Sequence, residues 1–366
     1  MNDRFADYGN SILNLSCSIL RAYGCGCRHP TLPAADKLLG KGFKNVVLLL
    51  FDGLGTDALE HHLPEGSFLR RHQISRISSV FPPTTTAATT SVISGLSPAE
   101  HGWLGWRLYF SELDDNIDLF PNTGLDGKAI KRHAANTYLP NKNIMQTINE
   151  SGKARAVSLR SFGADGYKSR RGMRRQILGL CKERGGHFIY CYDSQPDALM
   201  HTTGCYSEKT RREIIRINRA VQKLCARLKN TLVMVTADHG LIDAADSRCI
   251  LDYPKLVDTL ERLPSIEPRV LNCFVKKGRD ADFIAECGNA FGDDVLIVSK
   301  AQAIESGIFG DTESNAILEK RLGDYLLIPV TAMAIHNTYA SARKFIGVHA
   351  GIDKRELEVP LIAVET

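Results

Sequence analysis

Two short segments pair a carboxylate with an imidazole at spacings that suit metal binding. In "PDALMH", Asp197 and His201 are four residues apart, so on a helix both side chains lie on one face. In "ADHG", Asp238 and His239 are adjacent and follow an apolar segment. Carboxylate oxygen and imidazole nitrogen without thiolate form a ligand set suited to zinc or manganese in a hydrolytic site. Taken singly, each histidine is more often a structural residue than a ligand.

Three continuous apolar runs, each followed by an acidic turn, predict strands that position these residues. Continuous rather than alternating apolar residues indicate strands covered on both faces, as in a parallel sheet. Helical segments such as 207–228 separate the runs, so we expect an α/β fold with a mainly parallel central sheet and helices on both faces. Ligands of open α/β sheets lie beyond the carboxyl ends of the strands, so Asp52, Asp197 and Asp238 should converge there. The three runs are residues 45–51, 187–192 and 231–236.

A threonine-rich stretch, "SSVFPPTTTAATTSVISG" (78–95), offers hydroxyl groups for chemistry. Pro82 and Pro83 cannot lie in a central strand, so they end a strand near Phe81. The segment that follows reads as a short helix closed by Gly95. Free amides at the start of such a helix can bind phosphate oxygens and the charge that develops during phosphoryl transfer. A surface linker is the other interpretation of this composition.

Five motifs, in order, resemble the alkaline phosphatase superfamily and, more narrowly, its nucleotide pyrophosphatase/phosphodiesterase (type I phosphodiesterase) family. They are "FDGLG", "FPPTT…SVISGLSPAEHG", "PDALMH", "TADHG" and "GVHAG", and the resemblance extends from about residue 44 to the C-terminus. Each motif alone is weak, but the ordered set is specific. The resemblance implies a hydrolase of phosphate esters with two divalent metal ions, Zn²⁺ in the first place and Mn²⁺ as the alternative.

The resemblance also assigns the candidate ligands. It places Asp52, Asp238 and His239 on one ion together with Thr85, and Asp197, His201 and His349 on the other. The family usually has Gly-x-His-Gly-Gly around the last histidine, whereas this chain has "GVHAG". We expect Ala350 to alter the geometry of the loop more than the ligation.

The nucleophile that the resemblance implies is Thr85. In the family this threonine lies four residues after a phenylalanine and ten before a glycine, and both Phe81 and Gly95 select Thr85. We expect Thr85 to be the N-cap of the helix, at its positive end. Its hydroxyl would attack phosphorus and form a covalent phospho-threonine, with metal coordination favouring the alkoxide.

Substrate contacts are less clear from the sequence. The family commonly has an asparagine that binds a phosphate oxygen where this chain has Trp106, and Tyr109 or Asn122 could supply the missing donor. The Trp106 indole offers one donor and a stacking face. We expect a small anionic phosphate ester, including nucleotides, and favour a diester. A phosphomonoesterase or phosphonate hydrolase with the same centre, and a metal-bound ligand-binding protein without catalysis, are the alternatives.

The chain has 366 residues, enough for a large core. We expect a catalytic core of 1–245 and 345–366 and an α+β cap of 246–344, which includes a βαβ-like unit. The net charge of +5 does not by itself indicate a nucleic-acid binder, and we expect no stable nucleic-acid complex. The basic cluster Lys168, Arg170, Arg171, Arg174 and Arg175 fits a solvated helix face or an anionic substrate.

No stretch reaches the about 20 apolar residues of a membrane span, and the N-terminus does not read as a secretory signal. We therefore expect a cytoplasmic protein without a membrane partner. Ten cysteines are scattered at irregular spacing, which predicts reduced thiols rather than a disulfide framework. Cys25 and Cys27 form the closest pair, and metal binding or oxidation there stays open. The sequence leaves the oligomeric state unknown.

Overall fold

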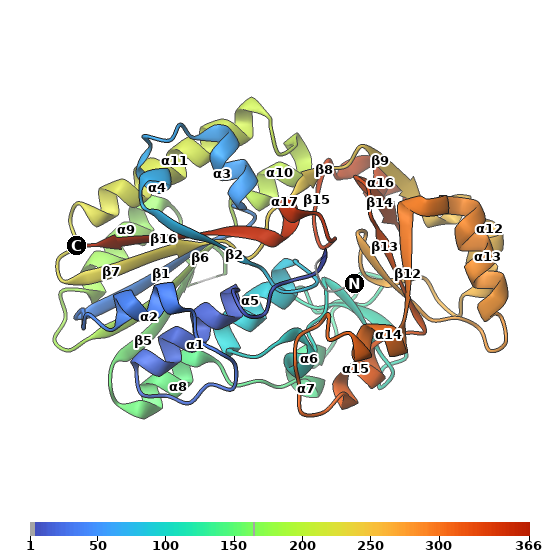
Figure 1. The fold of residues 1–366 in the computed structure, drawn as a ribbon, viewed down its shortest axis with the longest axis horizontal. Helices are drawn as coiled ribbons and strands as arrows, with labels where there is room; N and C mark the ends of the chain where they lie inside the picture. Colours follow the sequence, from blue (N-terminus) through green and yellow to red (C-terminus); the bar gives the residue numbers. More distant parts are fainter. Residues whose placement is uncertain (1–3, 164) are drawn as a thin grey trace.

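A six-stranded sheet in the order β2-β16-β7-β1-β6-β5 forms the centre of the larger lobe (Figure 1). The structure is a computed structural model, and it describes residues 4–163 and 165–366. Strands β5, β6, β1 and β7 are mutually parallel, whereas the C-terminal strand β16 runs antiparallel to β7 and β2. The strands are β1 (Asn45–Phe51), β2 (Gln73–Ser78), β5 (Arg155–Arg160), β6 (His187–Asp193), β7 (Thr231–Thr236) and β16 (Glu358–Glu365).

Helices cover both faces of this sheet, which confirms the expected α/β fold. One face carries α1 (Ile12–Ala22), α2 (Pro33–Leu39), α5 (Thr85–Ser94) and α8 (Ile144–Ser151). The other face carries α3 (Thr56–His62), α4 (Phe68–Arg71), α9 (Arg170–Leu180) and α11 (Glu208–Cys225). Strand β1 is buried along its whole length, because both of its faces pack against helices.

A second six-stranded sheet, in the order β12-β13-β11-β10-β3-β4, forms the smaller lobe, and all its pairs are antiparallel. Alternate residues of β13 face two separate cores: Leu326 and Ile328 join one, and Leu327 joins the other. The β11, α13 and β12 segments form the expected βαβ-like unit, because β11 and β12 both run antiparallel to the strand between them. The elements are β3 (Arg107–Phe110), β4 (Asp115–Asp118), β10 (Ser265–Glu267), β11 (Val270–Cys273), α13 (Asp280–Phe291), β12 (Val295–Ser299) and β13 (Tyr325–Pro329).

The second sheet does not follow the sequence-based division of the chain. Four of its strands come from the 246–344 region, whereas β3 and β4 come from residues 107–118, which the division places in the core. Shorter elements complete the two lobes and the loops between them. They are α6 (Pro98–His101), α7 (Ala134–Tyr138), α10 (Asp197–Thr203), β8 (Ile242–Asp243), β9 (Asp246–Cys249), η2 (Ile250–Asp252), α12 (Pro254–Thr259), η3 (Gly292–Asp294), α14 (Lys300–Glu305), α15 (Ala316–Arg321), β14 (Met333–His336), α16 (Tyr339–Lys344), β15 (Gly347–Val348) and α17 (Lys354–Leu357).

The expectation of reduced thiols is wrong for one pair of cysteines. Cys17, buried in α1, forms a disulfide with Cys27, and their Cα atoms are 5.4 Å apart. The chain turns back after α1, which brings together two residues whose spacing of ten gave no signal in the sequence. Cys25 is a free thiol. Among the residues that the structure describes, no helix combines the length and the apolar character that a membrane crossing requires.

Candidate metal centre

Three acidic residues meet beyond the carboxyl ends of the central strands, as the sequence predicts. Asp52 follows β1 directly, Asp238 is the second residue after β7, and Asp197 begins α10. The backbone amide of Asp197 donates to the carbonyl of Asp52 at 3.0 Å, so the β1 and β6 loops touch directly. All three carboxylates are buried.

The histidines present one ring nitrogen to these acids and anchor the other on the backbone. Nδ1 of His201 lies 2.7 Å from the carbonyl of Gly347, Nδ1 of His239 lies 3.1 Å from that of Gly240, and Nδ1 of His349 lies 3.2 Å from that of Pro83. A carbonyl can only accept, so each Nδ1 carries a proton and each Nε2 is the nitrogen available to a metal ion. This is the outer-shell arrangement of metal-binding histidines.

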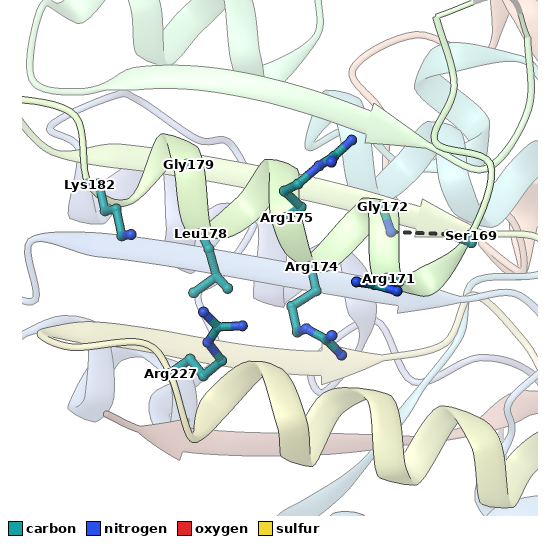
Figure 2. A pocket seen from close by; sticks show the side chains of 9 residues that line it. All are labelled: Ser169, Arg171, Gly172, Arg174, Arg175, Leu178, Gly179, Lys182 and Arg227. Atoms are coloured by element: carbon teal, nitrogen blue, oxygen red, sulfur yellow. Dashed lines mark hydrogen bonds between the residues drawn. The ribbon is translucent and has the colours of Figure 1, made fainter.

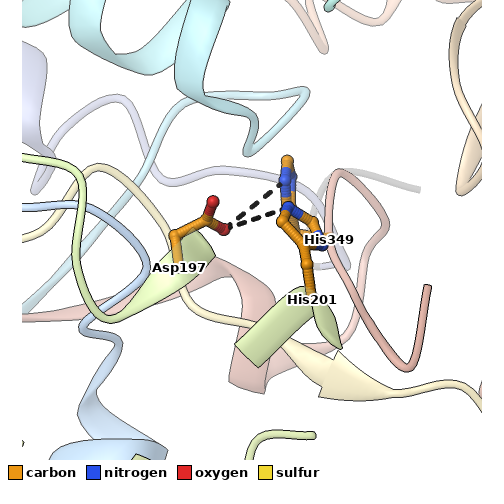
Figure 3. Close-up of side chains that lie close together, drawn as sticks. All are labelled: Asp197, His201 and His349. Carbon is orange, nitrogen blue, oxygen red and sulfur yellow. Dashed lines mark ion pairs between the residues drawn. The ribbon is translucent and has the colours of Figure 1, made fainter. Parts of the chain in front are cut away.

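The ligand atoms form two overlapping groups. Asp197, His201 and His349 make one group (Figure 3), in which Oδ1 of Asp197 lies 3.3 Å from Nε2 of His201 and 3.9 Å from Nε2 of His349. Asp52, Asp197 and His239 make the other, with Nε2 of His239 lying 3.4 Å from Oδ1 of Asp52. The His239 and His349 rings stack with centroids 3.9 Å apart, so the two groups adjoin.

Asp238 stands beside the second group. Its Oδ1 accepts from the amides of Gly53 and His239, at 3.1 and 3.0 Å, while its Oδ2 lies 3.7 Å from Nε2 of His239. The structure therefore brings together all seven residues that the sequence selects, and it places Asp197 within reach of both groups.

The donor set fits divalent cations. Oδ1 of Asp197 and Oδ2 of Asp238 are buried without a hydrogen-bond partner, and both face the lone pair of an imidazole. Two acceptors facing each other repel unless a positive charge lies between them. Burial, with Asp238 and Asp197 nearby, holds the pKa of Asp52 well above its usual value, and burial also raises the pKa of Asp238. The uncompensated negative charge is what bound cations would neutralise.

The pKa values of Asp197 and His201 also indicate that a positive charge is favoured between these two side chains. Burial acts to lower the pKa of His201, but the adjacent Asp197 carboxylate outweighs burial and raises that pKa to about 9. For Asp197, burial acts upward on the pKa, and the neighbouring histidines, His201 first, outweigh it and lower the pKa. A proton or a metal ion between these two side chains would satisfy both.

Thr85 is the first residue of α5, one position after the N-cap that the sequence predicted it to be. The carbonyl of Thr84 accepts the first helical bond, from the amide of Ala88, and Thr84 has extended backbone angles. Thr84 is therefore the N-cap and Thr85 the first helical residue, which corrects the prediction that Thr85 is the cap. Gly95 ends the helix in the left-handed conformation, as expected.

The Thr85 hydroxyl nevertheless faces the acidic group. Its Oγ1 lies 3.5 Å from both carboxylate oxygens of Asp52 and 3.2 Å from Nε2 of His239. The side chain is buried. The first amides of α5, those of Thr85, Thr86 and Ala87, have no acceptor within the helix.

Two further residues contact the site, and the motifs gave no indication of either. The hydroxyl of Tyr192, near the end of β6, donates to Oδ2 of Asp52. The carboxylate of Glu267, at the end of β10 in the smaller lobe, accepts from Oγ1 of Thr84 at 2.6 Å and from the amide of Trp106 at 2.8 Å. Burial raises the pKa of Glu267. Tyr192 could be suspected only from its place in a strand that ends at the site.

The three suggested substrate contacts have different positions. Trp106 is 39% exposed, and its ring meets the ring of Phe120, which is 43% exposed, edge to face at 5.8 Å. The hydroxyl of Tyr109 donates to Asp114 at 2.7 Å, within the smaller lobe. The amide group of Asn122 donates to the carbonyl of Ile130 and accepts from the amide of Ala134. Tyr109 and Asn122 thus have local structural partners, and only Trp106 connects through Glu267 to the cap of α5.

Ala350 occupies a backbone conformation that favours glycine. Its φ angle is +94°, in the region that L-residues rarely adopt, and its side chain is fully buried. The loop keeps this positive φ angle although the Cβ of Ala350 makes it less favourable than it would be for glycine. His349 still lies in the first group, and the expectation that its ligation survives stays a prediction.

The comparisons with known proteins agree with this geometry. A family model described as type I phosphodiesterase / nucleotide pyrophosphatase matches residues 46–352. Murine ectonucleotide pyrophosphatase/phosphodiesterase 5 is similar with a TM-score of 0.68 at 16% identity, over 88% of each chain. An inactive threonine-to-alanine form of that protein, in complex with AMP, matches with the same TM-score and identity over 87% of each chain.

A second kind of neighbour is a bacterial enzyme. Phosphonoacetate hydrolase from Sinorhizobium meliloti 1021, in complex with phosphonoformate, has a TM-score of 0.65 at 15% identity, over 87% of this chain and 89% of its own. No curated protein sequence matches the chain.

The chain shares the fold of these solved structures and carries paired acid–histidine groups at the carboxyl ends of its central strands. It belongs to the type I phosphodiesterase / nucleotide pyrophosphatase family, because the family model covers well over half of its length. It is thus a phosphoric ester hydrolase.

Proposed function

We propose that the protein is a phosphodiesterase that uses Thr85 as its nucleophile and two zinc ions. The observation that carries the proposal is the position of the Thr85 hydroxyl at the start of α5, within 3.5 Å of Asp52 and His239. In a two-metal site, bound cations neutralise the carboxylates and favour the deprotonated hydroxyl. Asp52, Asp238 and His239 would hold one ion with Thr85, and Asp197, His201 and His349 the other; Mn²⁺ could replace zinc.

The chain's own groups would do the rest. Thr85 Oγ1 would attack phosphorus, the alcohol group would leave, and a phospho-threonine would form for later hydrolysis. The free amides at the start of α5 would bind the non-bridging oxygens. Tyr192 would hold Asp52 in place through its hydrogen bond. A threonine-to-alanine form of the murine neighbour is described as inactive, which supports a threonine nucleophile here.

The charge around the site supports a diester. A monoester carries close to two negative charges at neutral pH, and enzymes for monoesters usually add a cation to hold the second. Within the described residues, the ion pairs of Asp52, Asp197 and Asp238 involve histidine only, and Glu267 adds another acidic group. The exposed Trp106–Phe120 pair offers aromatic faces for a flat substituent such as a nucleobase.

A phosphonate hydrolase or phosphomonoesterase is the second candidate, supported by the structural similarity to phosphonoacetate hydrolase. We propose that the smaller lobe, 246–344 together with β3 and β4, caps the site and selects the substrate, because Glu267 joins it to Thr84.

A cytoplasmic location remains a prediction. Eight free cysteines agree with it, whereas the Cys17–Cys27 disulfide argues for an oxidising compartment.

Removing the metals tests the centre. Dialysis against a chelator should abolish hydrolysis of bis(p-nitrophenyl) phosphate, and added Zn²⁺ should restore it, with Mn²⁺ restoring less. Elemental analysis of the reconstituted protein should give two zinc ions per chain, and Asp197→Ala, which removes the residue within reach of both groups, should lower that number. Full turnover in the metal-free protein would exclude this mechanism.

A substrate panel tests the diester assignment. We expect a higher kcat/KM for bis(p-nitrophenyl) phosphate than for p-nitrophenyl phosphate or phosphonoacetate. Trp106→Ala should raise KM more for aromatic than for aliphatic diesters, because only the former can stack on the indole. Preference for the monoester or for phosphonoacetate would favour the second candidate and leave the metal assignment intact.

A further inference from the structure

A strongly basic pocket lies between α9 and α11, on the outer side of the central sheet (Figure 2). Its volume is about 620 Å³, within the range of small-molecule sites. Five cationic side chains line it: Arg171, Arg174 and Arg175 of α9, Lys182 just after α9, and Arg227 just after α11. In Figure 2, Arg174 extends from α9 toward α11, and the Arg227 side chain points back toward Leu178 of α9. None of the lining residues belongs to the candidate metal centre.

The charge of the whole chain is concentrated around this pocket. Residues 168–184 and 207–230 contain 15 lysines and arginines and three acidic residues, a net charge of +12. The complete chain has a net charge of only +5, so all remaining residues together carry −7. A general excess of basic residues therefore does not explain the pocket.

The lining cations have no carboxylate partner among the residues that the structure describes. Arg170, their neighbour in α9, pairs with Asp193 at 2.9 Å and with Glu213 at 2.5 Å. Arg171, Arg174 and Arg175 make no such pair, although they lie on the same helix. Arg171 is also in the first turn of α9, where the positive end of the helix dipole disfavours a cation. Grouping these charges is unfavourable unless an anion joins them.

The shape and lining indicate the class of ligand. Gly172 and Gly179 leave the surface of α9 open between the arginines, and a Cβ at Gly179 would meet no atom within 4 Å, so packing does not require that glycine. Leu178 is the single large apolar side chain of the lining, and no aromatic ring is among its residues for a base to stack on. The guanidinium group of arginine can donate two parallel hydrogen bonds to two oxygens of one phosphate group.

We propose that this pocket binds a compact ligand bearing several phosphate groups, at a site separate from the metal centre. Its chemistry is shared by a soluble polyphosphorylated metabolite and by the headgroup of a polyphosphorylated lipid. The proposal does not depend on the reaction at Thr85.

Binding of myo-inositol hexakissulfate, measured by calorimetry on the full chain at 0.1 M salt, tests the pocket. This probe is a compact polyanion without a phosphate ester, so turnover cannot consume it. Arg174→Gln/Arg227→Gln should weaken binding by about tenfold or more, because it removes one guanidinium group of α9 and one from the segment just after α11. The matched control Arg184→Gln/Lys223→Gln removes two exposed cations of the same segments outside the lining and should change binding less than about twofold.

The same variants distinguish a soluble ligand from a lipid headgroup, and both from nonspecific binding of polyanions. Vesicles with phosphatidylinositol 4,5-bisphosphate, against phosphatidylcholine alone, show whether a lipid headgroup is bound with the same dependence on Arg174 and Arg227. Inositol trisphosphate binding without vesicle binding assigns a soluble ligand. Equal loss in both double variants, or binding only to a single-stranded oligonucleotide, would overturn the proposal, as would the absence of saturable binding. Ester hydrolysis should be unchanged in all variants, which confirms that they fold.

Discussion

At the residue scale, the start of α5 decides which hydroxyl reaches the acids. Thr84, Thr85 and Thr86 are adjacent, yet their environments differ. Thr84 donates to Glu267, Thr85 faces Asp52 and His239, and the hydroxyl of Thr86 is buried without a partner. The spacing from Phe81 and Gly95 predicts Thr85 as the nucleophile, and the structure places its hydroxyl near Asp52 and His239 although the cap is Thr84. A cap boundary is among the least certain features of a sequence, since one residue changes it.

We therefore expect Thr85→Ala to lower kcat by a factor on the order of 10³ or more, because the covalent step is lost. Thr86→Val is the matched control: it removes a hydroxyl that makes no hydrogen bond and keeps the side-chain shape, so turnover and stability should stay near wild type. Thr85→Ser should retain measurable turnover. Steady-state kinetics on the zinc-loaded proteins, with circular dichroism to check folding, measure these effects. If Thr86→Val lost turnover while Thr85→Ala stayed active, the assignment of Thr85 as the nucleophile would be wrong.

At the element scale, the central strands could be read from the sequence and the smaller lobe could not be delimited. Strands β1 and β7 begin and end where their apolar runs do, because a strand covered on both faces needs a continuous apolar segment. Strands β3 and β4 are short and mixed in character; β4 pairs with β3, and β3 pairs with β10, where Arg107 lies opposite Ile266, about 160 residues later in the sequence. Such a pairing depends on tertiary packing, which single-sequence patterns do not contain.

Glu112 joins the β3–β4 turn to α15 and gives this lobe a pH dependence. The carboxylate accepts from Nη1 and Nη2 of Arg321, both at 2.8 Å, and from Lys320 at 2.6 Å. The hydrogen bonds from Arg321 hold the pKa of Glu112 at about 2. The unfolded value is about 4.3, so the stabilisation is complete above that pH and is lost as the pH falls toward about 2.

Glu112→Gln should therefore reduce the free energy of unfolding by about 2 kcal/mol at pH 7, because it leaves the buried Arg321 with a neutral partner. The difference from wild type should shrink as the pH is lowered from about 5 to about 2. Urea unfolding at several pH values measures it. Glu65→Gln changes a carboxylate that is 91% exposed and should have little effect at any pH. A difference that grows on acidification would contradict this account.

At the scale of the whole molecule, a buried ion pair joins the smaller lobe to the loops of the metal centre. Arg269, next to β11, donates to both oxygens of Glu356 in α17, at 3.1 and 2.6 Å, and both side chains are almost fully buried. Glu356 also accepts from the amide of Gly351, two residues after His349, and its carbonyl accepts from the amide of Gly240. No motif marks Arg269, because its partner lies 87 residues away in sequence. The ligands were visible in the sequence, whereas this support for their loops was not.

Arg269→Met should lower the free energy of unfolding by about 3–5 kcal/mol, because it leaves the Glu356 carboxylate buried and unpaired. It should also lower kcat, since the loops carrying His239 and His349 lose a common support. Arg269→Met/Glu356→Gln should recover part of the stability, because no unpaired charge remains. Arg279→Met is the control: this arginine pairs with Asp258 and Asp282 at the surface, so its loss should cost less than about 1 kcal/mol. Denaturant unfolding gives the free energies, and steady-state kinetics give kcat. If Arg269→Met were no more destabilising than Arg279→Met, the ion pair would not be what holds the smaller lobe against the metal-centre loops.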